Sequence, residues 1–106
     1  MLSQEEIKQE ISRLIKELEP DAEIILYGSR ARGDAGEHSD WDILVLLDSE
    51  EVTLKKEQQI RHHLFDLELR IDQPISIYAH SKQKWQNQLS VTPYYSNVAN
   101  EGIFLK

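Results

Sequence analysis

The segment Ile24–Asp48 reads IILYGSRARGDAGEHSDWDILVLLD, and it contains two apolar runs separated by a polar loop. The runs Ile24–Tyr27 and Ile43–Leu47 are short, continuous and rich in isoleucine and leucine, a pattern typical of buried strands. The loop between them concentrates glycine, serine, arginine and aspartate. We therefore expect two core strands joined by a segment that carries the chemistry.

Two aspartates open the second run, and a glycine-serine turn closes the first. Because side chains alternate along a strand, Asp40 and Asp42 are expected on one face and Trp41 on the other, in the core. If the strands are antiparallel neighbours, the aspartates meet Gly28-Ser29 at one edge of the sheet. Paired carboxylates beside free backbone N–H groups suit a complex of Mg²⁺ with a triphosphate.

These residues resemble a known family. Gly28-Ser29, the following RARG stretch and Ser39-Asp40-Trp41-Asp42 are similar to the minimal nucleotidyltransferase domain of the DNA polymerase β-like superfamily. The resemblance is specific over about a quarter of the chain, because several residue types recur there at the right spacing. It implies that Asp40 and Asp42 are catalytic and hold Mg²⁺ or Mn²⁺, and that Gly28 and Ser29 bind the nucleotide.

The resemblance also implies an activity and a partner. The domain would transfer a nucleoside monophosphate, AMP from ATP, to a hydroxyl acceptor and release pyrophosphate. Minimal members often act with a separate, all-helical HEPN protein as a toxin–antitoxin pair and adenylylate a tyrosine of that partner. The alternative is a degenerate nucleotidyltransferase fold that binds its partner as an antitoxin or scaffold without chemistry.

One position departs from the family pattern. The family usually places a third carboxylate in the third strand, where this chain has Ser76. Serine is a weaker metal ligand and cannot act as a carboxylate base. Either two aspartates suffice, or a nearby acid replaces the missing one, or catalysis is weak or lost; the candidate acids are Asp66, Glu68 and Asp72.

Three further polar residues flank the site. Arg30 and Arg32 could contact phosphate or a partner surface, or each could pair with a local acid in solvent. Ser39 could contact the nucleotide or cap the turn before Asp40. We predict Arg30 and Ser39 as nucleotide-binding residues, together with Gly28 and Ser29.

The rest of the chain predicts a small α/β domain. We expect a mixed three-stranded sheet flanked by helices, the polymerase β-like core, with residues 1–106 forming a single nucleotidyltransferase domain. The further elements are helices over Ser3–Glu19 and Thr53–Arg70, a strand over Ile75–Ala79, a short helix capped by Ser81, a helix from Thr92 to Gly102, and an apolar tail over Ile103–Leu105.

The composition of the chain argues against several classes of function. The chain has 106 residues, a net charge of −7 and no cysteine. The acidic balance argues against nonspecific nucleic-acid binding, which needs a basic face. No apolar run reaches the length of a membrane span, and the polar N-terminal segment does not resemble a signal peptide. Absence of cysteine fits a cytoplasmic protein.

Overall fold

A central sheet organises the computed structural model, which describes residues 2–36, 38–87 and 90–105. Its strands are β1 (Glu23–Tyr27), β2 (Trp41–Leu47), β3 (Ile75–Ser81) and β4 (Ile103–Leu105). They lie in the order β3-β2-β1-β4. β1 pairs antiparallel with β2 and β4, whereas β2 and β3 are parallel. The sheet is therefore mixed, as the sequence predicts.

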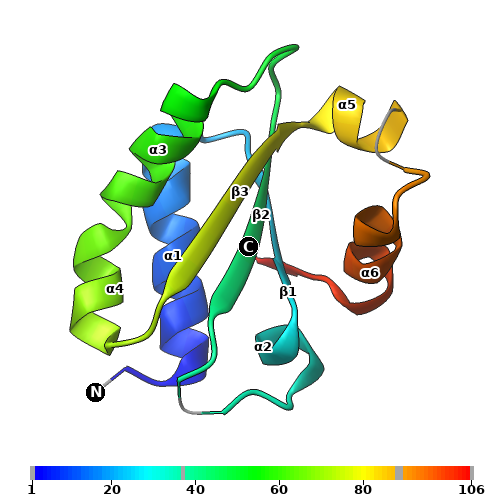
Figure 1. Cartoon of the computed structure of the whole chain (residues 1–106). Coiled ribbons are helices and arrows are strands. Elements are labelled where there is room, and N and C mark those ends of the chain that lie inside the picture. Colours follow the sequence, from blue (N-terminus) through cyan, green and yellow to red (C-terminus); the bar gives the residue numbers. More distant parts are fainter. Residues whose placement is uncertain (1, 37, 88–89, 106) are drawn as a thin grey trace.

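Helices cover both faces of this sheet (Figure 1). One face is covered by α1 (Gln4–Leu18), α3 (Leu54–His63) and α4 (Phe65–Ile71), and the other by α5 (Lys82–Asn87) and α6 (Pro93–Glu101). α2 (Ser29–Arg32) is one turn between β1 and β2, at one end of the sheet. In the described part of the chain, no helix combines the length and apolar character that a bilayer span requires.

The local signals explain where the first helix lies. The Ser3 hydroxyl accepts from the Glu6 N–H, and the Glu6 carboxylate accepts from the Ser3 N–H, so a capping box starts the helix. Ile7, Ile11 and Ile15 form its buried stripe. The helix ends before Pro20, which disfavours helical backbone at the residue before it.

The core has two parts, one on each face of the sheet. The larger part, under α1, α3 and α4, contains the fully buried Trp41 and the residues that share its face of β2, which are Ile43, Val45 and Leu47. The smaller part, under α5 and α6, joins Ile25, Leu44 and Leu46 to Trp85 and Val98. Because Asp42 alternates with the residues of the larger part, its side chain points to the face with the smaller part.

Three of the predicted elements are wrong in extent or type. The helix expected over Thr53–Arg70 is interrupted at Leu64, which ends α3 and precedes α4. The sheet has four strands instead of three, because the apolar tail Ile103–Leu105 pairs with β1 as β4. β3 also continues to Ser81, two residues beyond its expected end. The fold class itself, a small mixed α/β sheet flanked by helices, is as expected.

Candidate active site

The sheet register places the sequence candidates at one end of the sheet. Asp42 on β2 lies opposite Tyr27 on β1 and Ser76 on β3. Residues in register on neighbouring strands share a face, so these three side chains form one row. β1 ends here while β2 and β3 begin here, and the Gly28 turn therefore lies beside Asp42.

Gly28 and Asp42 are in direct contact. Gly28 has φ +76° and ψ −160°, a conformation that is essentially restricted to glycine. A Cβ atom on Gly28 would overlap Oδ2 of Asp42. The carboxylate thus lies against the backbone of the turn, which only a residue without a side chain permits.

The carboxylate of Asp42 lies in a negative environment. Its pKa is raised, first by burial, then by the negative charges of Asp40 and Glu101, while Arg32 opposes the shift. Asp40 is exposed and Asp42 is half-buried, so the pair opens toward solvent. Accumulated negative charge of this kind is relieved by a bound cation, and carboxylate oxygens are the ligands that Mg²⁺ prefers.

Glu101, at the C-terminal end of α6, is a site residue that sequence reasoning missed. Its Oε1 accepts from the Gly28 N–H at 3.0 Å, and its Oε2 lies 3.0 Å from Nη1 of Arg32. β4 pairs Ile103 with Leu26, and the antiparallel register extended by two residues sets Glu101 opposite Gly28. Assigning Ile103–Leu105 to a strand beside β1 would have found it.

Arg30 and Ser39 shape the loop that carries Asp40. The guanidinium of Arg30, 6% exposed, donates to the Ser39 carbonyl oxygen at 2.9 and 3.2 Å and lies over the Trp41 ring at 4.7 Å. The Ser39 hydroxyl accepts from the Gly36 N–H at 2.8 Å, as expected of a turn cap. Contact of either residue with a nucleotide stays a prediction. Arg32, by contrast, pairs with Asp34 and Glu101.

Trp41 fixes the two aspartates from the opposite face. Its indole N–H donates to Oε1 of Gln73 at 2.7 Å, and its backbone N–H donates to the Pro74 carbonyl oxygen at 2.9 Å. The ring is fully buried, as expected. Trp41 therefore joins the start of β2 to the turn before β3 and sets the directions of its aspartate neighbours.

None of the three acids proposed to replace the missing carboxylate is placed beside Asp42 as Ser76 is. Asp66 and Glu68 belong to α4, whose Leu67 packs in the core on the opposite face of the sheet. Asp72 ends α4 in the left-handed conformation, with φ +53°, as a turn residue. Among the described residues, no three or more histidine, aspartate or glutamate side chains are grouped to hold a metal ion. Asp40 and Asp42 stay the predicted donor pair, and the register places Ser76 beside Asp42.

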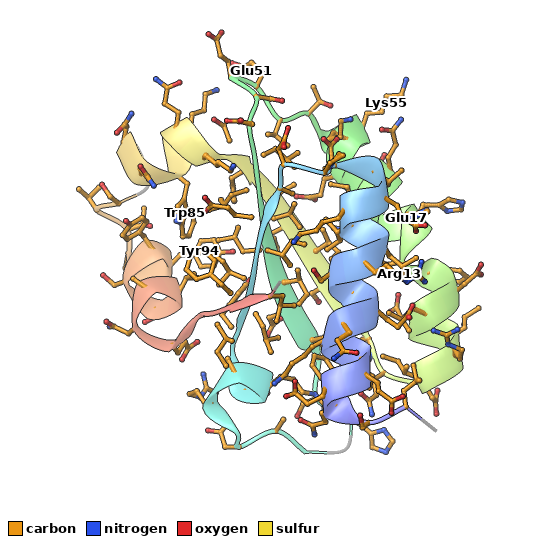
Figure 2. The ribbon with its side chains drawn as sticks, turned by 180° about the vertical axis from the view of Figure 1, so that it is seen from behind. Arg13, Glu17, Glu51, Lys55, Trp85 and Tyr94 are labelled. Carbon is orange, nitrogen blue, oxygen red and sulfur yellow. The ribbon has the colours of Figure 1, made fainter. Side chains whose placement is uncertain are left out.

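Aromatic side chains continue the face beyond Asp42. Figure 2 shows Trp85 of α5 and Tyr94 of α6 close together beside the sheet. Their ring centroids are 5.3 Å apart. The Tyr94 hydroxyl donates to the Tyr27 hydroxyl at 3.1 Å, next to Asp42. Burial is the main cause that raises the pKa of Tyr27. The cluster anchors α6, and with it Glu101, over the sheet.

The family model of the nucleotidyltransferase domain matches residues 6–99. The chain therefore belongs to the nucleotidyltransferase family, and the Gly28 turn, the aspartate pair and strands β1, β2 and β3 lie within the matched region, whereas Glu101 and β4 follow it. The resemblance noted in the sequence is confirmed.

A curated relative agrees with this assignment. Over 55 residues the chain is 46% identical to "Putative protein adenylyltransferase MJ0141" of Methanocaldococcus jannaschii, a match that covers 52% of each chain. The chain thus spans about half the length of that curated relative.

Two solved structures share the fold. A crystal structure of a toxin-antitoxin with AMP-PNP matches 93% of this chain and 72% of its own, with TM-score 0.68 and 20% identity. A mutant of the toxin-antitoxin MntA-HpeT matches 93% and 71%, with TM-score 0.65 and 17% identity.

Proposed function

We propose that this protein catalyses Mg²⁺-dependent transfer of AMP from ATP to a hydroxyl group, with release of pyrophosphate. The observation that carries the proposal is the Asp42 carboxylate packed against the Gly28 turn, with the charge of Asp40 close by, within a chain of the nucleotidyltransferase family. We further propose that the acceptor is a tyrosine of a helical, HEPN-type partner protein. The name of the curated relative and the toxin-antitoxin neighbours support this choice.

Different residues of the chain would bind the metal ion and the phosphates. Asp40 and Asp42 would hold the metal ion, and Gly28 and Ser29 would bind the phosphates through backbone N–H and hydroxyl groups. Bound Mg²⁺ would neutralise phosphate charge and polarise the reacting phosphoryl group. The acceptor oxygen forms a bond to the α-phosphorus, the bond from that phosphorus to the bridging oxygen breaks, pyrophosphate leaves, and the hydroxyl proton passes to solvent.

A transfer assay tests this proposal. The wild-type chain is incubated with α-labelled ATP and the helical partner, with Mg²⁺, with Mn²⁺ and with EDTA. We expect label on the partner only when metal is present, and loss of label when the acceptor tyrosine is changed to phenylalanine. Metal-independent labelling, or no labelling of any hydroxyl acceptor, would contradict the proposed reaction.

Nucleotide binding gives a second readout that does not need an acceptor. ATP with Mg²⁺ should stabilise the fold by about 2.7 kcal/mol at a ligand concentration a hundredfold above its dissociation constant. Asp42→Ala should remove the metal-dependent part of that shift, whereas Asp48→Ala, at an exposed residue just beyond the far end of β2, should retain it. Equal shifts in the two variants would exclude Asp42 as a metal ligand.

A binding module without catalysis is the second candidate function. Ser76 favours it, because a serine occupies the register position beside Asp42 where the family pattern implies a carboxylate. Under this alternative, the chain binds its helical partner with the same affinity whether or not nucleotide is present, and the labelling assay stays negative.

A further inference from the structure

The Gly28 N–H is already occupied in this structure. It donates to Glu101 Oε1 at 3.0 Å in a partly buried position. The proposed function requires the same N–H to face a phosphate oxygen. A backbone amide has one hydrogen, so it cannot make a well-aligned bond to a carboxylate and to a phosphate at once.

The second oxygen of Glu101 occupies a second candidate donor. Oε2 lies 3.0 Å from Nη1 of Arg32, and Arg32 also pairs with Asp34 at 3.2 Å. A carboxylate bridging a backbone amide and a guanidinium makes the contacts that a phosphate would make. The charge of Glu101 also adds to those of Asp40 and Asp42, which would repel a triphosphate further.

The position of Glu101 is fixed by the elements around it. It is the last residue of α6, and the Gly102 N–H after it donates to the Val98 carbonyl oxygen at 2.7 Å. A Cβ atom on Gly102 would lie 2.5 Å from that oxygen and 2.7 Å from Cγ2 of Ile25. The chain thus passes tightly from α6 into β4, and the bonds from Glu101 to Gly28 and Arg32 tie this junction to the end of β1.

We infer that Glu101 is a latch that occupies the phosphate position, and that a nucleotide must displace it from Gly28 and Arg32, releasing the junction between α6 and β4. This inference rests on the proposed function, because it assigns regulation to the same site. In the resting protein Glu101 competes with nucleotide for these donors, and anything that draws α6 away relieves this competition.

Binding measurements on Glu101→Gln test the latch. The probe is α,β-methylene-ATP with Mg²⁺, which is not turned over, and the readout is calorimetry. We expect binding tighter than wild type by about tenfold, the factor that corresponds to one hydrogen bond to a charged group. Glu51→Gln removes the same charge from an exposed pair with Lys84 elsewhere, and should bind like wild type.

Hydrogen exchange provides a readout of the junction itself. In the wild type, the probe should reduce protection over residues 98–105, whereas ligand binding without displacement would leave it unchanged or raise it. In Glu101→Gln this segment should already exchange faster, and the probe should change it little. Glu101→Asp, which keeps the charge but shortens the reach, should behave like Glu101→Gln and serves if that variant folds poorly.

The outcomes separate the latch from the proposed function. Equal or weaker binding by both Glu101 variants, while the wild type binds, overturns the latch and leaves the nucleotide site intact; weaker binding would mean that Glu101 holds the turn in shape for the ligand. No binding by wild type or by any variant overturns the proposed nucleotide site, and the latch with it.

Discussion

Gly28 is required for two reasons: its backbone conformation favours glycine, and Asp42 leaves no space for a side chain. Only the first reason applies to Gly33, because its φ is +82° and no atom lies within 4 Å of a Cβ built there. Gly28→Ala should therefore lower the free energy of unfolding by about 1–3 kcal/mol from strain, and by more from overlap with Asp42. Gly33→Ala should cost about 1–2 kcal/mol.

Urea denaturation of both glycine variants measures the difference. The Gly28 variant should also lose nucleotide binding, since the carboxylate of Asp42 must move. Equal destabilisation of the two variants would show that contact with Asp42 contributes nothing to the requirement for glycine at Gly28.

Ser76 lies beside Asp42 in the register, so Ser76→Asp would set a third carboxylate near Asp40 and Asp42. Like charges raise each other's proton affinity and destabilise the metal-free fold. We expect a lower melting temperature in EDTA, recovery with Mn²⁺, tighter Mn²⁺ binding and faster transfer. Ser76→Ala, which adds no charge, should change turnover little. If Ser76→Asp alters neither Mn²⁺ affinity nor transfer, the position is not a vacant ligand site.

At the scale of elements, α3 protects the outer edge of the sheet. Oε2 of Glu57 accepts from the Ala79 N–H at 3.0 Å, and Nη2 of Arg61 donates to the Ile77 carbonyl oxygen at 3.2 Å. Glu57 and Arg61, which form an ion pair on α3, thus also satisfy β3 backbone groups that face away from β2. Unpaired edge groups invite pairing with another chain.

Glu57→Ala should therefore cost about 1–2 kcal/mol, since it removes the acceptor of a partly buried amide. Glu51→Ala, which breaks an exposed pair with Lys84, should cost less. Thermal melts of both variants compare the losses, and light scattering on heating should show earlier association for Glu57→Ala. If the two variants give the same melting temperature and the same scattering, the Glu57–Arg61 pair does not protect the edge of the sheet.

The sequence predicts long, patterned elements and misses those set by distant contacts. The apolar spacing of Ile60, Leu64 and Leu67 continues through the break at Leu64, so periodicity alone cannot reveal that the helix is interrupted. β4 has three residues, and Phe104 is 64% exposed, so no alternation marks it. Its strand identity comes from pairing with β1, far away in the sequence.

The same distinction explains the site. Gly28, Asp40 and Asp42 are close in sequence and flank two strong strand patterns, so their convergence follows from one antiparallel pairing. Glu101 reaches the same turn from the other end of the chain, through β4. Its role could not be read from local pattern, because its position depends on a strand that the pattern does not show.

On the scale of the whole molecule, the two faces of the sheet differ in character. One face holds the larger aliphatic core under three helices, and the other holds an aromatic cluster under α5 and α6. Helices cover that second face except at the end where Asp42 and Ser76 lie half-exposed. The aromatic cluster thus stabilises the helix that carries Glu101, and its stability bears on the site.

His80 makes that face sensitive to pH. Its ring stacks on Trp85 with centroids 5.8 Å apart and meets the edge of Tyr94 at 6.4 Å. Burial lowers the pKa of His80, and the charge of Glu57 only partly opposes this. Between the lowered folded pKa and the unfolded value of about 6.5, the unfolded chain binds more protons than the folded one. The stability contributed by neutral His80 is therefore complete above that unfolded value and is lost as the pH falls toward the folded pKa.

We expect His80→Phe, which keeps a ring against Trp85 but cannot be protonated, to flatten the dependence of stability on pH between about 7.5 and 5.5. The measurement is the free energy of unfolding in urea at several pH values across that window. Val98→Ala, which loosens the same cluster without removing a titratable group, should lower stability at every pH and keep the wild-type slope. If His80→Phe retains the full wild-type slope, acid weakening of this protein arises elsewhere, and the aromatic face does not couple pH to the helix that ends at Glu101.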